Sequence, residues 1–333
     1  MKLKYYAEEQ SNYTKNYAYF LDGTGSGKKI LIKDIESFKD KKTGFLWISL
    51  DYTLDESKDI LEKLDIDEFA VKLLTEEETR PRSIIFNDFI LTILRGINLT
   101  PGHEPEDMVS VRIYLDKNKI ITTRRRKLLS FHDLRHDILN HKAPKTTSEF
   151  LVTLNYKLLN RIDDAVESVD ADLDVLEDLV SDADTLDCRA KIADLRREAI
   201  LIKRYISPQK DALGKLYLEE HRLLTQKDRL YLRECIDKLQ RCIEDLDSFR
   251  DRASVIHEEL NNKINEDMNN KLFFLSLIAI IFLPITFLTG LLGVNLNGIP
   301  GATEGPSFWI FCGILLFIIA LTMFVLYKIK WFK

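Results

Sequence analysis

The chain has 333 residues, of which 45% are hydrophobic and 30% are charged, and its formal net charge is −5. This apolar content excludes a disordered chain, and four scattered cysteines exclude a disulfide-rich scaffold. The segment 1–271 holds 45 Lys and Arg against 52 Asp and Glu, a net charge of −7, which argues against a nucleic-acid-binding protein. The polar segment 1–10 has no apolar core, so we expect no signal peptide.

Residues 1–146 are expected to form an α/β sandwich domain. Short runs rich in Ile, Val, Phe and Tyr, separated by turn residues, predict strands. The predicted strands are 17–21, 29–32, 44–50, 83–94, 109–114 and 119–123. Helical patterns at 54–64 and 67–74 interrupt them, and this mixed order favours helices packed on a sheet.

A glycine-rich segment, 23–29, superficially resembles a phosphate-binding loop. Its leading glycine is one residue too close to the lysine, and no Ser or Thr follows Lys28. We therefore predict a hairpin turn between the first two strands, and we expect neither a nucleotide partner nor ATP-driven pumping.

A histidine pair is a candidate metal site in the same domain. His132 and His136 are four residues apart, which places them on one face of a helix, and Asp133 and Asp137 adjoin them. A polar helix surface is the alternative, because no third ligand is evident. The chain has no recognisable Ser/His/Asp set or pair of catalytic carboxylates, so we expect neither an enzyme nor a resident cofactor.

Residues 147–271 are predicted to be helical, with Pro208 and Gly214 as their only proline and glycine. Apolar residues recur at steps of mostly three and four from Ile236 to Met268, and no stop signal separates them from the apolar segment that follows. We predict one stalk helix over about 227–294, on the order of 100 Å long.

Charge is segregated within this helical region. Residues 162–188 include eleven Asp and Glu and no Lys or Arg, whereas 189–210 is rich in Arg and Lys. The acidic segment could concentrate cations beside a pore. Alternatively, it pairs with a basic neighbouring helix or forms a solvated face. Cys235 and Cys242 are seven residues apart, which predicts small buried packing residues.

The C-terminal segment 272–333 carries only four charged side chains, too few for the surface of a soluble domain. Two uncharged stretches within it, 272–294 and 307–327, are each long enough to cross a bilayer core of about 30 Å. Buried core helices are the alternative, but core helices are rarely apolar on every side over this length. We therefore predict two membrane spans.

The positions of the lysines predict the orientation of the two spans. Lys271 precedes the first span, and the connecting loop 295–306 contains no Lys or Arg. The tail 328–333 adds Lys328, Lys330 and Lys333. Because Lys and Arg accumulate on the cytoplasmic side, we expect a multi-pass protein of the inner (plasma) membrane with both termini in the cytoplasm.

A stripe of small, hydroxyl-bearing and apolar residues runs along the first predicted span. Its members follow one another at steps of three and four, which places them on one helix face. They are Asn269, Leu272, Ser276, Ala279, Leu283, Thr286 and Gly290. Such a face suits the wall of a pore, although small residues also favour packing between helices.

Asn295 lies at the end of that span, where the chain turns. Its amide offers an oxygen to a cation, and carbonyl groups at the helix C-terminus add partial negative charge. Gly293-Val294-Asn295 resembles the Gly-Met-Asn motif of the CorA superfamily of divalent-cation transporters. The valine, together with Gly-Ile-Pro-Gly at 298–301, resembles the ZntB branch, which is associated with zinc. Further similarities lie at 78–82, 120–125 and 330–331.

The resemblance implies a homopentameric funnel in which the first span lines the pore and continues the stalk helix. Gly293, Val294 and Asn295 would form the selectivity motif, with a ring of Asn295 side chains holding a hydrated cation. Asn269, Leu283 and Thr286 match pore-lining positions of the family. Zinc uptake coupled to protons is implied as well, although neither span carries an Asp, Glu or His to relay a proton.

The residues themselves leave the ion open. Zinc prefers Cys and His ligands, and the segment 272–333 contains only Cys312 and no His. A ring of Asn oxygens suits a cation that keeps much of its water, so a magnesium, cobalt or nickel channel is the alternative. A membrane-anchored scaffold without transport is the second alternative. An inside-negative potential favours import, because it contributes about 2.3 kcal/mol per charge per 100 mV.

Overall fold

The computed structural model describes residues 16–38, 41, 43–77, 79–98, 107–182, 185–294 and 305–328. The chain forms two compact units, Met1–His257 and Glu258–Lys333. The boundary between them falls within the helix α7 (Gln226–Leu292).

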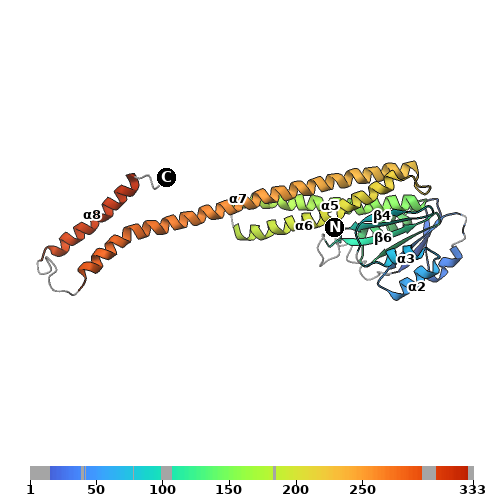
Figure 1. The fold of residues 1–333 in the computed structure, drawn as a ribbon, viewed down its shortest axis with the longest axis horizontal. Helices are drawn as coiled ribbons and strands as arrows, with labels where there is room; N and C mark the ends of the chain where they lie inside the picture. Colours follow the sequence, from blue (N-terminus) through green and yellow to red (C-terminus); the bar gives the residue numbers. More distant parts are fainter. Residues whose placement is uncertain are drawn as a thin grey trace. The chain divides into compact units, whose positions relative to one another are not determined.

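The first unit contains a seven-stranded mixed sheet (Figure 1). Its strand order is β2-β1-β3-β7-β6-β5-β4, in which β3 and β7 are parallel and the other five neighbouring pairs are antiparallel. The strands are β1 (Tyr17–Leu21), β2 (Gly27–Ile30), β3 (Phe45–Asp51), β4 (Arg82–Ile85), β5 (Ile90–Gly96), β6 (Val109–Leu115) and β7 (Lys119–Arg124). Each predicted strand overlaps one of these, with one exception.

The prediction of a single strand over 83–94 is wrong, because β4 and β5 are two antiparallel strands joined by a tight turn. Ile85 pairs with Ile90, and the backbone N–H of Phe86 donates to the carbonyl oxygen of Phe89 at 3.0 Å. The rings of Phe86 and Phe89 stack with centroids 4.4 Å apart. Because these aromatic residues flank the turn on both sides, the sequence is nearly continuous in β-forming residues across it.

The predicted hairpin turn between β1 and β2 is confirmed. The carboxylate of Asp22 accepts from the backbone N–H groups of Thr24, at 2.8 Å, and Ser26, at 3.2 Å. The bond from Thr24 is the main reason that the pKa of Asp22 lies below its usual value. Gly23 and Gly25 have φ values of +81° and +119°, conformations that glycine adopts without strain. The glycines of the loop between β1 and β2 therefore allow the tight turn.

Helices cover both faces of the sheet, which confirms the predicted α/β sandwich. One face packs against α2 (Asp55–Lys63), α3 (Glu68–Thr75) and the 3₁₀ segment η2 (Ile32–Phe38). The other face packs against α4 (Leu129–Leu139) and α5 (Thr147–Asp182). Strand residues alternate between these two layers because successive side chains point to opposite faces.

Trp47 anchors the layer between the sheet, α4 and α5. It is fully buried, and its ring centroid lies 5.9 Å from that of Phe131 on α4 and 4.9 Å from that of Phe150 on α5. Its indole N–H donates to the hydroxyl of Thr122 at 3.1 Å, so the polar atom of the ring is satisfied.

Replacing Trp47 with Ala is expected to lower the free energy of unfolding by about 3–5 kcal/mol, because the change leaves a cavity among aromatic rings. Urea unfolding of the full chain in detergent, followed by circular dichroism, measures this loss. Leu31→Ala, at a side chain that is 60% exposed, is the control and is expected to change stability by less than about 0.5 kcal/mol. Equal losses in the two variants would contradict the role of Trp47.

Three long helices follow the sheet region: α5, α6 (Thr185–Leu218) and α7. Helices α5 and α6 pack against each other, and α6 also packs on β4 and β5. The predicted stalk helix over about 227–294 is confirmed by α7. The prediction of uninterrupted helix over 147–271 is wrong at 219–225, where the chain turns between α6 and α7.

A capping interaction explains why α7 begins where it does. The hydroxyl oxygen of Thr225 accepts from the backbone N–H of Asp228 at 3.2 Å, and the carboxylate of Asp228 accepts from the backbone N–H of Thr225 at 2.9 Å. This reciprocal pair satisfies N–H groups that the first turn of a helix leaves unbonded. The turn also contacts the β4–β5 loop, because a ring nitrogen of His221 lies 2.8 Å from the carbonyl oxygen of Phe86.

The two cysteines near the start of α7 are buried, as predicted. Cys235 and Cys242 are 2% and 1% exposed. Burial raises the pKa of the Cys235 thiol to about 11 and that of the Cys242 thiol to about 12. Both side chains therefore stay protonated and act as small packing residues rather than as ligands.

The second unit contains the C-terminal part of α7 and the helix α8 (Ser307–Lys328). Both helices are long and apolar enough to cross a membrane, since their most apolar 18-residue windows have mean hydropathies of 2.6 and 2.8. These windows are 0% and 6% buried, so the alternative of buried core helices is wrong. An apolar surface of this extent requires a non-aqueous environment or a partner.

Candidate ion pathway

The stripe predicted from sequence lies on one exposed face of α7. Its seven residues, defined here as the α7 stripe, fall within an arc of about 100° because successive helical residues are about 100° apart. They are Asn269, Leu272, Ser276, Ala279, Leu283, Thr286 and Gly290, and all are exposed. The two apolar members with the largest side chains, Leu272 and Leu283, are 57% and 71% exposed. The stripe thus presents a mixture of polar, small and apolar side chains on this face.

Partly buried residues occupy a different face of the same helix segment. They are Phe273, Leu277, Ile280, Ile281, Pro284, Ile285 and Leu288. A helix with one exposed stripe of small residues and another face of large apolar residues can expose the first to an aqueous pore and the second to lipid or neighbouring helices.

Helix α7 ends just before the candidate selectivity motif. The backbone N–H of Gly293 donates to the carbonyl oxygen of Thr289 at 2.9 Å, which closes the last turn. A Cβ atom at Gly293 would lie 2.8 Å from that same oxygen, closer than real Cβ contacts, so glycine suits this position. Val294 is 45% exposed. Asn295 lies outside the described residues, so its role stays a prediction.

The end of α7 offers oxygen atoms that carry partial negative charge. The final turn of a helix leaves carbonyl groups without intrahelical partners, and the helix dipole places about half a negative charge there. The hydroxyl of Thr289 donates to the carbonyl oxygens of Ile285 at 2.9 Å and Thr286 at 3.1 Å, so it is engaged within the helix. This end of α7 is therefore suited to a cation that approaches with its water shell.

The histidine pair lies on α4, as predicted, but gains no third ligand. The described residues contain no group of three or more His, Cys, Asp and Glu side chains that could hold a metal ion. His132 Nδ1 lies 3.9 Å from the carboxylate of Asp133, and both ring nitrogens of His136 lie 3.1 Å from the amide nitrogen of Asn140. These contacts suit a polar helix surface.

The acidic segment at the end of α5 forms ion pairs with α7. Arg252 on α7 donates to Asp170 at 2.9 Å, Asp174 at 2.6 Å and Glu177 at 2.7 Å. These hydrogen bonds, led by the one to Asp174, raise the pKa of Arg252. The predicted pairing with a basic side chain of a neighbouring helix is thus confirmed for Arg252 of α7.

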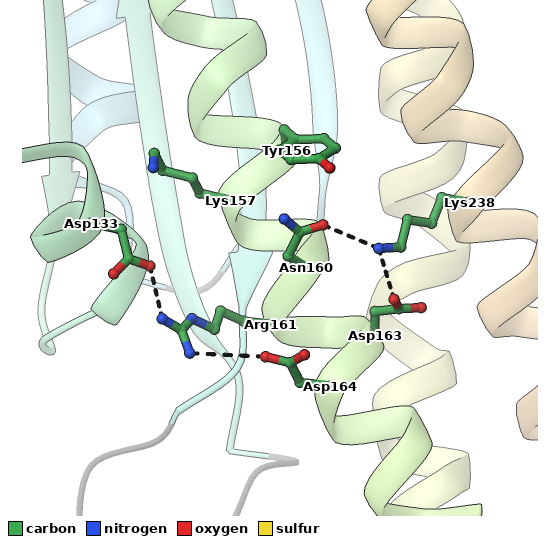
Figure 2. Close-up of a pocket in the computed structure, with 8 residues that line it drawn as sticks. All are labelled: Asp133, Tyr156, Lys157, Asn160, Arg161, Asp163, Asp164 and Lys238. Atoms are coloured by element: carbon green, nitrogen blue, oxygen red, sulfur yellow. Dashed lines mark hydrogen bonds and ion pairs between the residues drawn. The ribbon is translucent and has the colours of Figure 1, made fainter. Parts of the chain in front are cut away.

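A charged cavity of about 370 Å³ lies between α4, α5 and α7 (Figure 2). Lys238 binds Asp163 at 2.7 Å, and Arg161 binds Asp133 at 2.9 Å and approaches Asp164 at 3.8 Å. Burial acts to raise the pKa of Asp133, but its contacts with His132 and Arg161 prevail and lower that pKa. These acids and bases neutralise one another. Their ion pairs link the helices, and the cavity therefore presents no net charge to a ligand.

Sequence patterns missed a second, positively charged cavity at the end of β5 and β6. Arg95 and Arg112 line it. They are 17 positions apart in the chain, and antiparallel pairing places Ile93 opposite Arg112 and Arg95 opposite Ser110. The two arginines are therefore diagonal neighbours on one face of the sheet. Since no local spacing connects them, only the strand register brings them together.

The fold and the exposed apolar helices define the chain as a two-span membrane protein with a large N-terminal α/β domain. The family model described as "CorA-like Mg2+ transporter protein" matches residues 42–329. The chain therefore belongs to the CorA family and is a divalent-cation transporter, which confirms the resemblance found in the sequence.

Relatives that match almost the full length carry transporter names. The divalent cation transporter CmaX of Pseudomonas aeruginosa is 35% identical over 318 residues, which cover 95% of this chain and 96% of that protein. The zinc transport protein ZntB of Yersinia pseudotuberculosis is 33% identical over 317 residues, 95% of each chain. A structure of full-length CmaX has a TM-score of 0.83 at 34% identity and covers 96% of this chain and 100% of that chain.

Proposed function

We propose that this transporter takes up zinc across the inner membrane through a homopentameric pore. The similarity to a ZntB zinc transport protein over 95% of both chains carries this proposal. The Gly293-Val294-Asn295 motif, in which valine replaces the methionine typical of the magnesium-transporting members, supports the same branch of the family. Zinc is the cargo in this proposal and not a resident cofactor.

The pore is formed by several copies, because two spans cannot enclose a channel on their own. The α7 stripe supplies the wall, since its seven residues are exposed on a single face in the described chain. Leu272 and Leu283 form apolar constrictions. Ser276 provides a hydroxyl group between these constrictions, and Thr286 provides another one beyond Leu283. Five Asn295 side chains form the outer ring, beside the carbonyl groups at the end of α7.

Import is the favoured direction. With both termini in the cytoplasm, the Asn295 ring faces the outside and an inside-negative potential pulls a divalent cation inward. The gain is about 2.3 kcal/mol per charge per 100 mV, and a divalent cation gains roughly twice that. The chain belongs to a family of transporters, which argues against a membrane-anchored scaffold without transport.

A channel for magnesium, cobalt or nickel is the second candidate. The observation that favours it is the ligand chemistry of the segment 272–333, where Cys312 is the sole thiol and no His occurs. Zinc stripped of its water prefers sulfur and nitrogen ligands, whereas hydrated magnesium is held by oxygens. Zinc is therefore proposed to pass the Asn295 ring in hydrated form.

Reconstituted flux separates the two candidates. Proteoliposomes containing the full chain are expected to accumulate zinc faster than magnesium, cobalt or nickel at equal concentrations, measured with an internal metal indicator. Protein-free liposomes of the same lipid are the control. Uptake of magnesium with no detectable uptake of zinc would refute the zinc assignment.

The same vesicles test proton coupling. An inward proton gradient is expected to accelerate zinc uptake if transport is coupled to protons, as the ZntB resemblance implies. Uptake that is indifferent to the gradient identifies a passive channel, which agrees with the lack of Asp, Glu and His in 272–294 and 307–327.

A further inference from the structure

A cavity of about 240 Å³ in the α/β domain is lined by four arginines. Two of them, Arg95 and Arg112, come from the adjacent strands β5 and β6, and Arg125 and Arg126 follow β7. Two acidic residues, Glu77 and Asp107, also line the cavity. The ionised side chains of the lining thus leave a net charge of +2.

Arg112 is buried here without full hydrogen bonding. The residue is 1% exposed, and its guanidinium carbon lies 4.2 Å from the ring centroid of Tyr52. Its Nη2 donates to the carbonyl oxygen of Glu77 at 3.2 Å and to that of Glu76. Within the part of the chain that the structure describes, Nε and Nη1 have no hydrogen-bond partner. Unmet donors on a buried charge are costly, so an acceptor is expected beside them.

Arg95 shows the same pattern on the neighbouring strand. Its Nη1 donates to the carbonyl oxygen of Met108 at 2.9 Å, and its Nη2 donates to that of Thr79 at 2.6 Å. Its guanidinium carbon lies 4.6 Å from the ring centroid of Tyr205 on α6. Its Nε has no partner among the described residues. Burial and the nearby Arg112 lower the pKa of Arg95.

These contacts hold both guanidinium groups in place. Burial lowers the pKa of Arg112, whereas Tyr52 and the carboxylate of Glu76 act to raise that pKa. Backbone carbonyls and aromatic faces orient an arginine but carry no full negative charge. Arg125 and Arg126 lie at the exposed rim, where Arg126 approaches Asp107 at 3.5 Å. The cavity therefore combines fixed, buried positive charge with an accessible positive rim, unlike the neutral cavity between α4, α5 and α7.

We propose that this arginine cavity binds the phosphate group of a small anion. A phosphate group carries about −1.5 to −2 charges at neutral pH and offers three acceptor oxygens, which matches the net charge of +2 and the guanidinium donors of the lining residues. A carboxylate carries a single charge, and a halide offers a single acceptor atom. The phosphate comes either from inorganic phosphate or from a small phosphate monoester. This proposal does not rest on zinc transport.

Thermal unfolding of the full-length protein in detergent tests the site. Sodium phosphate is titrated against sodium chloride at matched ionic strength and pH, and ribose 5-phosphate is titrated in parallel. A ligand that binds only the folded state raises the melting temperature as its concentration exceeds the Kd. Phosphate also stabilises proteins by exclusion from their surface, so the comparison between variants decides the outcome.

Two variants remove parts of the site, and one matched variant does not. Arg112→Lys removes the buried fork, and Arg125→Gln removes a rim charge at an exposed position that folding tolerates. Arg250→Gln, at a side chain on α7 that is 43% exposed, removes the same charge outside the cavity and is the control. We expect the Kd for phosphate to rise about tenfold in the first two variants and to stay unchanged in the control.

The outcomes separate clearly. Saturable stabilisation of the wild type and of Arg250→Gln by phosphate, reduced in Arg125→Gln, supports the site even where Arg112→Lys fails to fold. Whichever of inorganic phosphate and ribose 5-phosphate binds with the lower Kd identifies the source of the phosphate group. Equal stabilisation by chloride, or equal phosphate responses in Arg125→Gln and the control, would overturn the proposal.

Discussion

Replacing Asn295 with Ala is expected to reduce divalent-cation flux in proteoliposomes to the level of protein-free vesicles. In the proposed pentamer the change removes five amide oxygens at once from the proposed selectivity ring. A hydrated divalent cation must exchange contacts with bulk water for contacts with such oxygens, and few other polar side chains lie along the α7 stripe. Initial rates of zinc uptake, measured with an internal indicator, report the loss.

Asn297→Ala is the matched control, because it removes the same amide from the same loop two residues further on. It is expected to retain uptake within about twofold of the wild type, because Asn297 lies outside the Gly293-Val294-Asn295 motif. Size-exclusion chromatography of both variants checks that the oligomer is intact. Zinc uptake in Asn295→Ala at the wild-type rate would show that the ring does not select the ion.

The long helix was predictable because its signals are local. Apolar residues at steps of three and four continue without glycine or proline from 236 into the first apolar span, and α7 ends within two residues of the predicted boundary. The start was marked as well, because Thr225 and Asp228 have the spacing of a reciprocal helix cap. The periodicity did not reveal the turn between α6 and α7, because 219–225 contains no glycine or proline.

The β4–β5 turn was missed for a related reason. Asn87 and Asp88 are turn-forming residues, but Phe86 and Phe89 on either side sustain the strand pattern across them. The tertiary structure then fixes the turn, because Arg222 forms an ion pair with Asp88 and His221 contacts Phe86. Contacts between residues that are more than 130 positions apart leave no trace in a local window.

The charge pattern of the helices predicted ion pairing but not the partner helix. Sequence showed that α5 ends in an acidic segment, but it could not show which helix lies beside that segment. A basic stretch that is adjacent in sequence suggested α6, whereas the packing brings Arg252 and Lys238 of α7 against α5. The arginine cavity is the extreme case, since its charge density exists only after β5, β6 and β7 have paired in register.

A bulky side chain on the α7 stripe is expected to block transport, whereas the same side chain on another face is not. Ala279 is an exposed member of the stripe, and Ala279→Phe adds an aromatic ring from each copy to the proposed pathway. Ile281 is partly buried and lies about 200° further around the helix, so Ile281→Phe enlarges a face directed towards lipid or other helices. We expect zinc uptake to fall to background in Ala279→Phe.

Ile281→Phe is the control, with uptake expected within about twofold of the wild type, because one large apolar residue replaces another at an apolar face. Both variants keep the helix pattern and the number of charges, so differences in membrane insertion are small. If Ala279→Phe transports as well as Ile281→Phe, the stripe does not face the pathway. In that case the small residues serve helix packing, and another face of α7 must line the pore.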